Sequence, residues 1–431
     1  MTALSIMKKS PITLRKTCRV CGSKKLLPIL SLGEQYAVGF LDSAKETAGS
    51  GPLALVLCNI KDGGCGLLQL KHTYDHDLLY RKYWYKSGIS TTMVKALGDI
   101  VRAAEKIIPL KPGDIAIDIG ANDGTLLRQY HRKGIHKVGF EPSNLWELAK
   151  QDGATIIHDY FNHAAFQKHL PGKKAKIITS ISMFYDLEDP NTFVADISQC
   201  LEDQGLWIIQ MNYLGLMMEE HTYDNISHEH LEYYSFIALE NLLKRHSFEI
   251  FDVELNDVNG GGFCCYIRKA GAKVKAFPGA ARRVTALRKK ELEAGYDDRQ
   301  VYANYAKDIA ALKKELVTLL KQEVKAGKRI YIYGASTRGL VVLQYCGITN
   351  KLIAAAVDKN SDKWGKYIVG TSIQVISFDD YRQNLPDYLL VLPYQFKREI
   401  INQEREFLLQ GGKMIFALPA VQVVTKKDLK K

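Results

Sequence analysis

Helical and extended patterns alternate along the middle of the chain. In residues 91–108 the apolar side chains recur every three or four positions, which predicts an amphipathic helix that ends before a Pro-Gly turn. Short apolar runs then predict buried strands at 115–119, 137–141, 176–182 and 205–210. Strands that alternate with helices are typical of a parallel, doubly wound α/β sheet.

The same alternation begins again near the C-terminus and predicts a second, smaller α/β unit with strands at 329–334, 352–358, 387–392 and 412–416. Charged residues 271–326 keep apolar side chains at helical spacing, which predicts a helix that bridges the two units. A coiled-coil dimer seam is the alternative, and the short run disfavours it. Turns and short extended runs before this region predict a small β-rich module. We therefore divide the chain into 1–75, 76–268, 269–328 and 329–431.

Four of the eight cysteines lie in the N-terminal module as two pairs, Cys18 with Cys21 and Cys58 with Cys65. Zn²⁺ takes four thiolates in a tetrahedron, and a two-residue gap lets one turn offer two of them. Four protein ligands leave no open position, so this metal would be structural. The alternative is a set of reduced thiols without a metal, because the second pair is spaced more widely than a standard knuckle.

A glycine loop follows the first predicted strand of the central unit and precedes a helix. Its spacing differs from the dinucleotide fingerprint, so a cofactor without a pyrophosphate is the better fit. Glu141, at the end of the next strand, can accept hydrogen bonds from both ribose hydroxyls, although strand-end acids also cap helices. This pairing indicates S-adenosylmethionine. Asp159 is a candidate for the adenine amine or a surface carboxylate. The loop candidates are Asp118, Gly120, Asn122, Asp123 and Gly124.

Acid and base groups cluster at His228, Glu229 and His230, and Tyr233 and Tyr234 follow them. Histidine ionises in the range needed for proton transfer, and a neighbouring carboxylate can orient or charge it. Three alternatives remain: a His-x-His metal site that lacks an evident third ligand, an exposed polar loop, and two core tyrosines.

An earlier hydroxyl-rich stretch contains Tyr83, Tyr85, Ser87 and Ser90. It could line the same pocket as the histidines. Capping of the helix that follows is the alternative.

The C-terminal unit carries its own strand–glycine–helix turn at residues 334–339. A helix N-terminus offers free N–H groups to a phosphate, and an arginine there adds a positive charge. An acidic and basic stretch follows the next strand, where a nucleoside ribose could lie. The alternative is a scaffold that only buries the central unit. The candidates are Gly334, Ser336, Thr337, Arg338, Asp358 and Lys363.

The charge balance is basic, with 59 Lys and Arg against 47 Asp and Glu. It indicates an anionic, phosphate-bearing ligand together with a generally basic background. The basic residues are not interleaved with aromatics as in a single-strand binding groove, so we expect no nucleic-acid partner. No run approaches the length of a membrane helix, and Met1–Lys9 is too short for a signal peptide. We therefore expect a cytoplasmic protein.

Together these motifs resemble the sugar C-methyltransferases that act on nucleotide-linked deoxyhexoses. The resemblance is carried by residues 18–22, 32–35, 118–124, 228–231 and 334–339. It implies a small N-terminal zinc-binding module, a central Rossmann-like class I methyltransferase domain, a helical bridge and a smaller C-terminal α/β domain for the sugar nucleotide. The module, the central domain and the C-terminal domain take segments 1–75, 76–268 and 329–431.

The resemblance also implies S-adenosylmethionine as methyl donor and an NDP-4-keto-6-deoxysugar as acceptor. His230 matches the expected base, Glu229 its neighbour, and Tyr85 a pocket tyrosine. The chain departs at Ser227 and at Tyr185, where some members have a tyrosine and a histidine. We expect Tyr85 or Tyr185 to hydrogen-bond the developing oxyanion, with C3 and C5 both open as the methylated carbon. An O- or N-methyltransferase on another acceptor is the alternative, and the protein is expected to be a monomer or homodimer.

Overall fold

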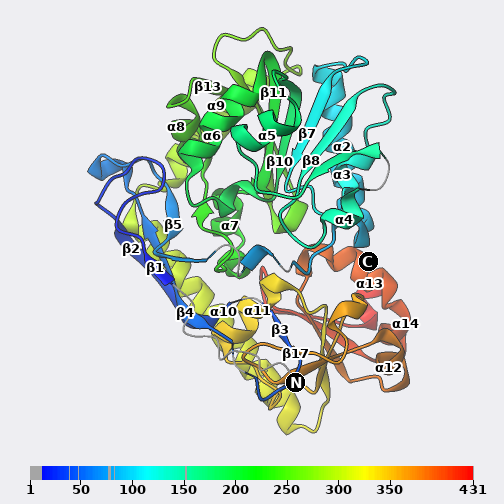
Figure 1. The fold of residues 1–431 in the computed structure, drawn as a ribbon. Coiled ribbons are helices and arrows are strands. Elements are labelled where there is room, and N and C mark those ends of the chain that lie inside the picture. The colour runs from blue at the N-terminus through cyan, green and yellow to red at the C-terminus, as the bar shows by residue number, and fades with distance from the viewer. Residues whose placement is uncertain are drawn as a thin grey trace.

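The computed structural model describes residues 12–37, 39–46, 48–75, 79–81, 83–150 and 153–430 (Figure 1). The expectation about Met1–Lys9 falls outside these residues. Within them, no helix is long and apolar enough to cross a membrane.

The central unit is built on a seven-stranded sheet. Five adjacent strands, from the middle of the sheet to one edge, are parallel. Near the other edge, β14 runs antiparallel to both of its neighbours. This order, with one reversed strand near an edge, confirms the predicted α/β class. Across the sheet the strands are β13 (Phe248–Asn256), β14 (Gly262–Lys269), β11 (Leu201–Asn212), β10 (Ala175–Ile181), β7 (Ile115–Ile119), β8 (His136–Phe140) and β9 (Thr155–Ile157).

Helices cover both faces of this sheet. Every side chain of β7 is buried, and because alternate residues point to opposite faces, both faces must be covered. Ala116 packs with α2 (Thr91–Ile107), whereas Ile117 packs with α6 (Pro190–Cys200), α8 (Phe236–Lys244) and α9 (Ala280–Ala294). Shorter helices complete the unit: α3 (Thr125–Arg128), α4 (Trp146–Ala149), α5 (His163–His169) and α7 (Leu214–Glu219).

The C-terminal unit has an eight-stranded sheet whose five inner strands are parallel. Its helices are α11 (Thr337–Cys346), α12 (Phe378–Gln383), α13 (Lys397–Gln403) and α14 (Arg405–Leu409). The strand order is β21 (Gln422–Val424), β20 (Lys413–Phe416), β19 (Tyr388–Val391), β15 (Ile330–Tyr333), β16 (Ala355–Val357), β18 (Ile373–Ile376), β17 (Tyr367–Ile368) and β3 (Phe40–Leu41).

The predicted bridge consists of two helices, α9 and α10 (Arg299–Lys325), because Gly295 takes a left-handed conformation with φ 68° and ends α9. Val284 and Leu287 of α9 pack in the central core. Ile309 and Leu316 of α10 pack in the core of the C-terminal unit. The pair therefore spans the two units, as the helical spacing predicts.

The N-terminal segment lies along both α/β units, as its blue ribbon shows in Figure 1. Its β3 extends the C-terminal sheet, and its main sheet takes in β12 from the central part of the chain. Strand exchange thus ties the N-terminal module to both units, and the division of the chain by residue number stays a prediction. The sheet order is β12 (Glu232–Tyr233), β5 (Leu68–Leu70), β4 (Ser50–Leu57) and β2 (Leu27–Tyr36), with β1 (Ile12–Leu14) paired to β6 (His72–Tyr74).

Candidate active site

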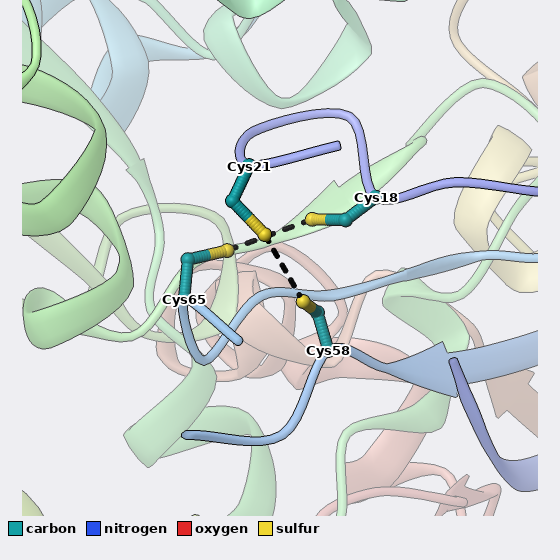
Figure 2. Close-up of side chains that lie close together, drawn as sticks. All are labelled: Cys18, Cys21, Cys58 and Cys65. Atoms are coloured by element: carbon teal, nitrogen blue, oxygen red, sulfur yellow. Dashed lines mark hydrogen bonds between the residues drawn. The ribbon is translucent and has the colours of Figure 1, made fainter. Parts of the chain in front are cut away.

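The four N-terminal cysteines converge on one point, although the two pairs lie about forty residues apart in the sequence. The sulfurs of Cys18 and Cys65 are 3.5 Å apart, those of Cys21 and Cys58 are 3.4 Å apart, and all four lie within 4.8 Å of one another (Figure 2). This is the donor set of a structural zinc site with no open position.

Two tight turns aim the thiols at this point. In the first, the amide of Gly22 donates to the carbonyl of Cys18. In the second, the wider gap is filled by the single turn η1 (Ile60–Asp62), after which the chain passes close to Cys58. A Cβ at Gly64 would lie 2.6 Å from the Cys58 sulfur, so only glycine fits there. The wide spacing is therefore compatible with a knuckle.

The electrostatics of the cluster require a cation. Contacts with Cys18 and Cys58, followed by burial, raise the pKa of Cys65, because four thiolates this close repel one another. A divalent zinc ion removes that penalty by coordinating the thiolates. The described residues hold the sulfurs in place to receive it.

The zinc knuckle docks directly on the central unit. Asn191 of α6 donates to the carbonyls of Arg19 and Val20 at 3.0 Å, and Asn241 of α8 donates to the carbonyl of Cys65 at 3.0 Å. Arg19, between the first two cysteines, forms an ion pair with Glu188 at 3.4 Å. The metal site is therefore built onto the central unit and is not a separate appendage.

A cavity of about 440 Å³ lies between the central and C-terminal units. The loops that follow β7, β8 and β10 line one side, and those that follow β15, β16 and β19 line the other. The carboxyl ends of the parallel strands in both sheets thus face one space, which is where open α/β sheets bind ligands. Residues 83–90 form part of the wall between them.

The glycine loop leaves room for a ligand on the central side of the cavity. Gly120 and Asn122 have φ values of 73° and 53° and line the cavity. Gly124 instead packs against α4, where a Cβ would lie 2.9 Å from Ala149. Glycine at position 120 lets the backbone turn sharply and approach a ligand, and glycine at position 124 lets it approach α4.

The side chains of Asn122 and Asp123 hold the wall segment next to the loop. Asn122 donates to the carbonyl of Tyr85 at 2.9 Å and accepts from the amide of Ser87 at 2.9 Å. Asp123 accepts from the amide of Gly88 at 2.8 Å and does not line the cavity. Both predicted cofactor residues thus fix the position of Tyr85.

Glu141 ends β8 and lines the cavity at the position expected for ribose recognition. Its carboxylate accepts from the amides of Asn122 at 2.6 Å and Ser143 at 2.9 Å. A carboxylate has more acceptor sites than these two amides occupy. Asp159 also lines the cavity, but it is exposed, and its carboxylate accepts from the amide of Tyr160 at 2.8 Å.

Asp118 lies away from the cavity, inside the central sheet. It accepts a hydrogen bond from the Thr179 hydroxyl at 2.7 Å, and burial raises its pKa to about 8. The structure therefore places it beneath the loop, where it supports β10 and β7, and not beside a ligand.

His230 and Glu229 line the cavity together. The Nδ1–H of His230 donates to the carbonyl of Asn225 at 2.7 Å, and burial lowers the pKa of His230 to about 4. Donation at Nδ1 leaves the Nε2 lone pair unprotonated and free to act as a base. Burial raises the pKa of Glu229 to about 7, and no hydrogen bond joins its carboxyl to the described residues.

Two tyrosines of the predicted set flank this pair. Tyr185 is buried and packs edge-on against the His230 ring, with ring centroids 4.4 Å apart. Tyr85 lines the cavity and remains 38% exposed. Both residues line the cavity, which the predicted oxyanion role requires.

The other members of the His-Glu-His motif lie behind the cavity. His228 is buried against Tyr74, with ring centroids 4.3 Å apart, and its Nε2 bonds to the carbonyl of Gln35 at 3.2 Å. Tyr233 belongs to β12, and the Tyr234 hydroxyl donates to Glu232 at 2.8 Å. None of these three predicted substrate-binding residues lines the cavity.

The C-terminal candidates all line the cavity. Ser336 caps α11 by accepting from the amide of Gly339 at 3.1 Å. The start of this helix borders the cavity. Lys363 forms an ion pair with Asp358 at 3.1 Å. Arg338 is engaged with the central unit, where it forms an ion pair with Asp224 at 2.9 Å.

Tyr80 and Asp186 are among the cavity residues that sequence reasoning missed. The Tyr80 hydroxyl donates to the carbonyl of Glu229 at 2.6 Å. Burial, followed by the charge of Glu229, raises the pKa of Asp186 well above its usual range. Asp186 follows the third predicted strand of the central unit, and that position was the available signal, because strand ends border the crevice.

Comparison with known proteins agrees with this geometry. Models of three protein families match consecutive parts of the chain: a zinc binding domain at residues 18–80, a methyltransferase domain at 93–253 and a C-methyltransferase C-terminal domain at 257–419. The C-methyltransferase NovU of Streptomyces niveus is 28% identical over 417 residues, which cover 95% of this chain and 97% of NovU.

Solved structures with lower similarity cover part of the chain. The plantazolicin methyltransferase BpumL in complex with SAH is 14% identical, with 42% of this chain and 84% of that chain covered and a TM-score of 0.33. An S-adenosylmethionine-dependent methyltransferase from Mesorhizobium loti is 15% identical, with 41% of this chain and 100% of that chain covered and a TM-score of 0.33.

The protein is an S-adenosylmethionine-dependent methyltransferase with a Rossmann-like central sheet. Within that class it is a C-methyltransferase, and its N-terminal part matches a zinc binding domain. The glycine loop, with its close backbone approach, and the acid at the end of β8 fit this cofactor.

Removal of zinc should unfold the knuckle and weaken its docking on the central unit. We expect a strong chelator to lower the thermal midpoint and to expose all four thiols to a thiol reagent, because the binding free energy of a structural metal is folding free energy. Cys200→Ser is the matched control, since Cys200 is a buried thiol outside the cluster. A protein that releases zinc without a change in midpoint would contradict a structural role.

Glu141→Ala should weaken cofactor binding selectively. Loss of hydrogen bonds to a carboxylate is expected to raise the Kd for S-adenosylmethionine by about tenfold or more. Isothermal titration measures this Kd, and Asp159→Ala gives a comparison at the exposed carboxylate. An unchanged Kd in Glu141→Ala would remove this residue from the cofactor site.

Proposed function

We propose that this C-methyltransferase transfers its methyl group to C3 or C5 of an NDP-4-keto-6-deoxyhexose, next to the ketone at C4, with His230 as the base. The observation that carries the proposal is the His230 ring itself. Its Nδ1–H is bound to the carbonyl of Asn225, so the opposite nitrogen is a proton acceptor at the cavity wall.

A carbon acceptor must be made nucleophilic before it can be methylated. A ketone acidifies the hydrogen on the neighbouring carbon, so Nε2 of His230 removes that proton and leaves an enolate. The hydroxyl of Tyr85 or Tyr185 then donates to the enolate oxygen, and such a donor contributes about 3 kcal/mol in a water-excluded site. Glu229, when ionised, stabilises the imidazolium that forms.

The carbon nucleophile and the methyl donor meet in the same cavity. When bound, S-adenosylmethionine supplies an electrophilic methyl on a sulfonium, whose departure leaves a neutral thioether. Glu141 and the glycine loop bind and orient the donor on the central side. The new C–C bond forms as the S–C bond breaks, so the donor itself requires no catalytic metal, and positioning supplies much of the rate.

The nucleotide part of the acceptor is assigned to the C-terminal side of the cavity. The N-terminus of α11, which is ten residues long, presents its first amides beside Ser336 and Thr337. Helix N-termini favour phosphate groups, and Asp358 lies after the next strand where a ribose can bind. We place the reaction in the cytoplasm, where a set of free thiols stays reduced for zinc.

The proposal is tested by solvent exchange at the acidified carbon. We incubate the enzyme and S-adenosylhomocysteine in D₂O with a panel of NDP-4-keto-6-deoxyhexoses and follow deuterium incorporation by mass spectrometry. His230→Asn should slow exchange and methyl transfer by about 100-fold or more, since general base catalysis is worth that much. Affinity for S-adenosylmethionine should change little. Methylation of a hydroxyl or amine without carbon exchange would indicate an O- or N-methyltransferase.

Glu229→Gln should remove an acidic limb from the pH profile of kcat/KM. Burial raises the pKa of Glu229 to about 7, so the native enzyme loses the ionised form as the pH falls through that value. The native kcat/KM is therefore expected to fall below pH 7, while the variant is slower and flat between pH 6 and 8. A variant that keeps the native profile would show that Glu229 does not titrate in the free enzyme.

A further inference from the structure

Arg338 joins the C-terminal unit to the central unit through a buried ion pair. It is the second residue of α11, and its Nη2 lies 2.9 Å from Oδ2 and 3.0 Å from Oδ1 of Asp224. The same nitrogen donates to the Tyr394 hydroxyl at 3.1 Å, and Nη1 donates to the carbonyl of Asn259. The guanidinium is therefore largely committed to protein partners.

Asp224 has little freedom to move. Its side chain is only 2% exposed, and a buried carboxylate is costly unless it is paired and hydrogen-bonded. It belongs to the turn η5 (Tyr223–Asn225), whose Tyr223 also packs on α11. The Tyr223 ring lies 5.3 Å from that of Tyr345, and its hydroxyl is 3.5 Å from the sulfur of Cys346. Helix α11 thus holds η5 at two points.

The last residue of η5 carries the carbonyl that accepts the Nδ1–H of His230, 2.7 Å away. We propose that Arg338 is a positioning residue for His230: by fixing Asp224, it keeps the carbonyl of Asn225 aimed at Nδ1 and so keeps the Nε2 lone pair toward the acceptor. The inference rests on the proposed role of His230 as base. It gives Arg338 a task other than the phosphate contact predicted from its place on a helix N-terminus.

This relay couples the two sides of the cavity. The arginine and the proposed phosphate site lie on the same helix, α11, whereas the base lies in the central part of the chain. The imidazole is therefore set in its working tautomer only when the nucleotide-binding unit is docked. A sub-ångström shift of η5 is enough to matter, because misplacement of a reacting group by about 1 Å can cost 100-fold in rate.

The variant that tests the relay removes both charges together. Arg338→Met alone leaves Asp224 buried and unpaired, so the fold itself could fail; the double variant Arg338→Met with Asp224→Asn avoids this. The matched control is Arg283→Met with Asp252→Asn, a partly buried ion pair between α9 and β13 whose Nε–Oδ1 distance is 2.8 Å. Only its carboxylate is fully buried, since the Arg283 side chain is 32% exposed, and the pair does not line the cavity.

The first measurement is the tautomer of His230 in the full-length protein, read from ¹⁵N-histidine NMR and assigned by the signals lost in His230→Asn. It requires no substrate. The relay predicts that the Nδ1–H form dominates in the native protein and in the control, and that the Arg338/Asp224 double variant shows a mixture of tautomers or loses the Nδ1–H form. An unchanged tautomer in the double variant overturns the proposal.

The second measurement is deuterium exchange at the acceptor carbon with the fastest NDP-4-keto-6-deoxyhexose of the panel. We expect the exchange rate, and kcat for methyl transfer, to fall about 10- to 100-fold in the Arg338/Asp224 double variant. The KM for S-adenosylmethionine in the methyl-transfer assay should change little, and the control should exchange at the native rate. If His230→Asn retains exchange, the proposed base is wrong. If His230→Asn loses exchange while the double variant keeps both its rate and its tautomer, only the positioning role is wrong.

Discussion

The four-cysteine zinc site helps to determine where the candidate base, His230, lies. The zinc knuckles are anchored to α6 and α8 of the central unit, and the chain that leaves Cys65 enters β5 directly. Strand β5 pairs with β12, and the amide of Leu70 donates to the carbonyl of Leu231, one residue after His230. Arg19, held between the first two cysteines, reaches Glu188, two residues after Asp186. A structural metal at this cluster thus supports the two cavity segments that carry His230 and Asp186, although it does not contact the molecules that bind in the cavity.

The cavity forms because the carboxyl ends of the strands in the two sheets face each other. Each open α/β sheet binds ligands outside the carboxyl ends of its strands, and here both crevices open into the same space. Segment 83–88 holds them together: Asn122 and Asp123 bind it from the cofactor loop, while Asn360 donates to the carbonyl of Trp84 and Lys86 pairs with Asp362 at 2.8 Å. Under the proposed function, the docking of the two units therefore brings donor and acceptor together, and each unit binds one of the two ligands.

Local pattern was sufficient to predict four parallel strands in each α/β unit, whereas it did not reveal the remaining strands or the long-range pairing. The run 115–119, which is apolar except for Asp118, is a strand with those bounds, because a strand buried on both faces leaves a nearly continuous apolar signature. The two-residue strands β3 and β12 carry no such signature, since their partners lie far away in the sequence. Asp118 illustrates the same limit at the site: a loop acid can face a ligand or the sheet, and only the position of Thr179 decides. The engagement of Arg338 with Asp224 likewise depends on tertiary packing that residue order does not reveal.

A base with a lowered pKa appears at first to be a poor choice for removing a proton from carbon. The same burial that lowers the pKa of His230 raises that of Glu229, because a site poor in water disfavours any isolated charge. In such a site an imidazolium is costly alone, but it is favourable beside an enolate or an ionised carboxylate, since attraction between opposite charges grows as the dielectric falls. The penalty in the free enzyme is thus offset when the opposite charge develops on the acceptor. Under the proposed mechanism, burial therefore confines proton transfer to the occupied cavity, where the methyl donor lies next to the carbanion.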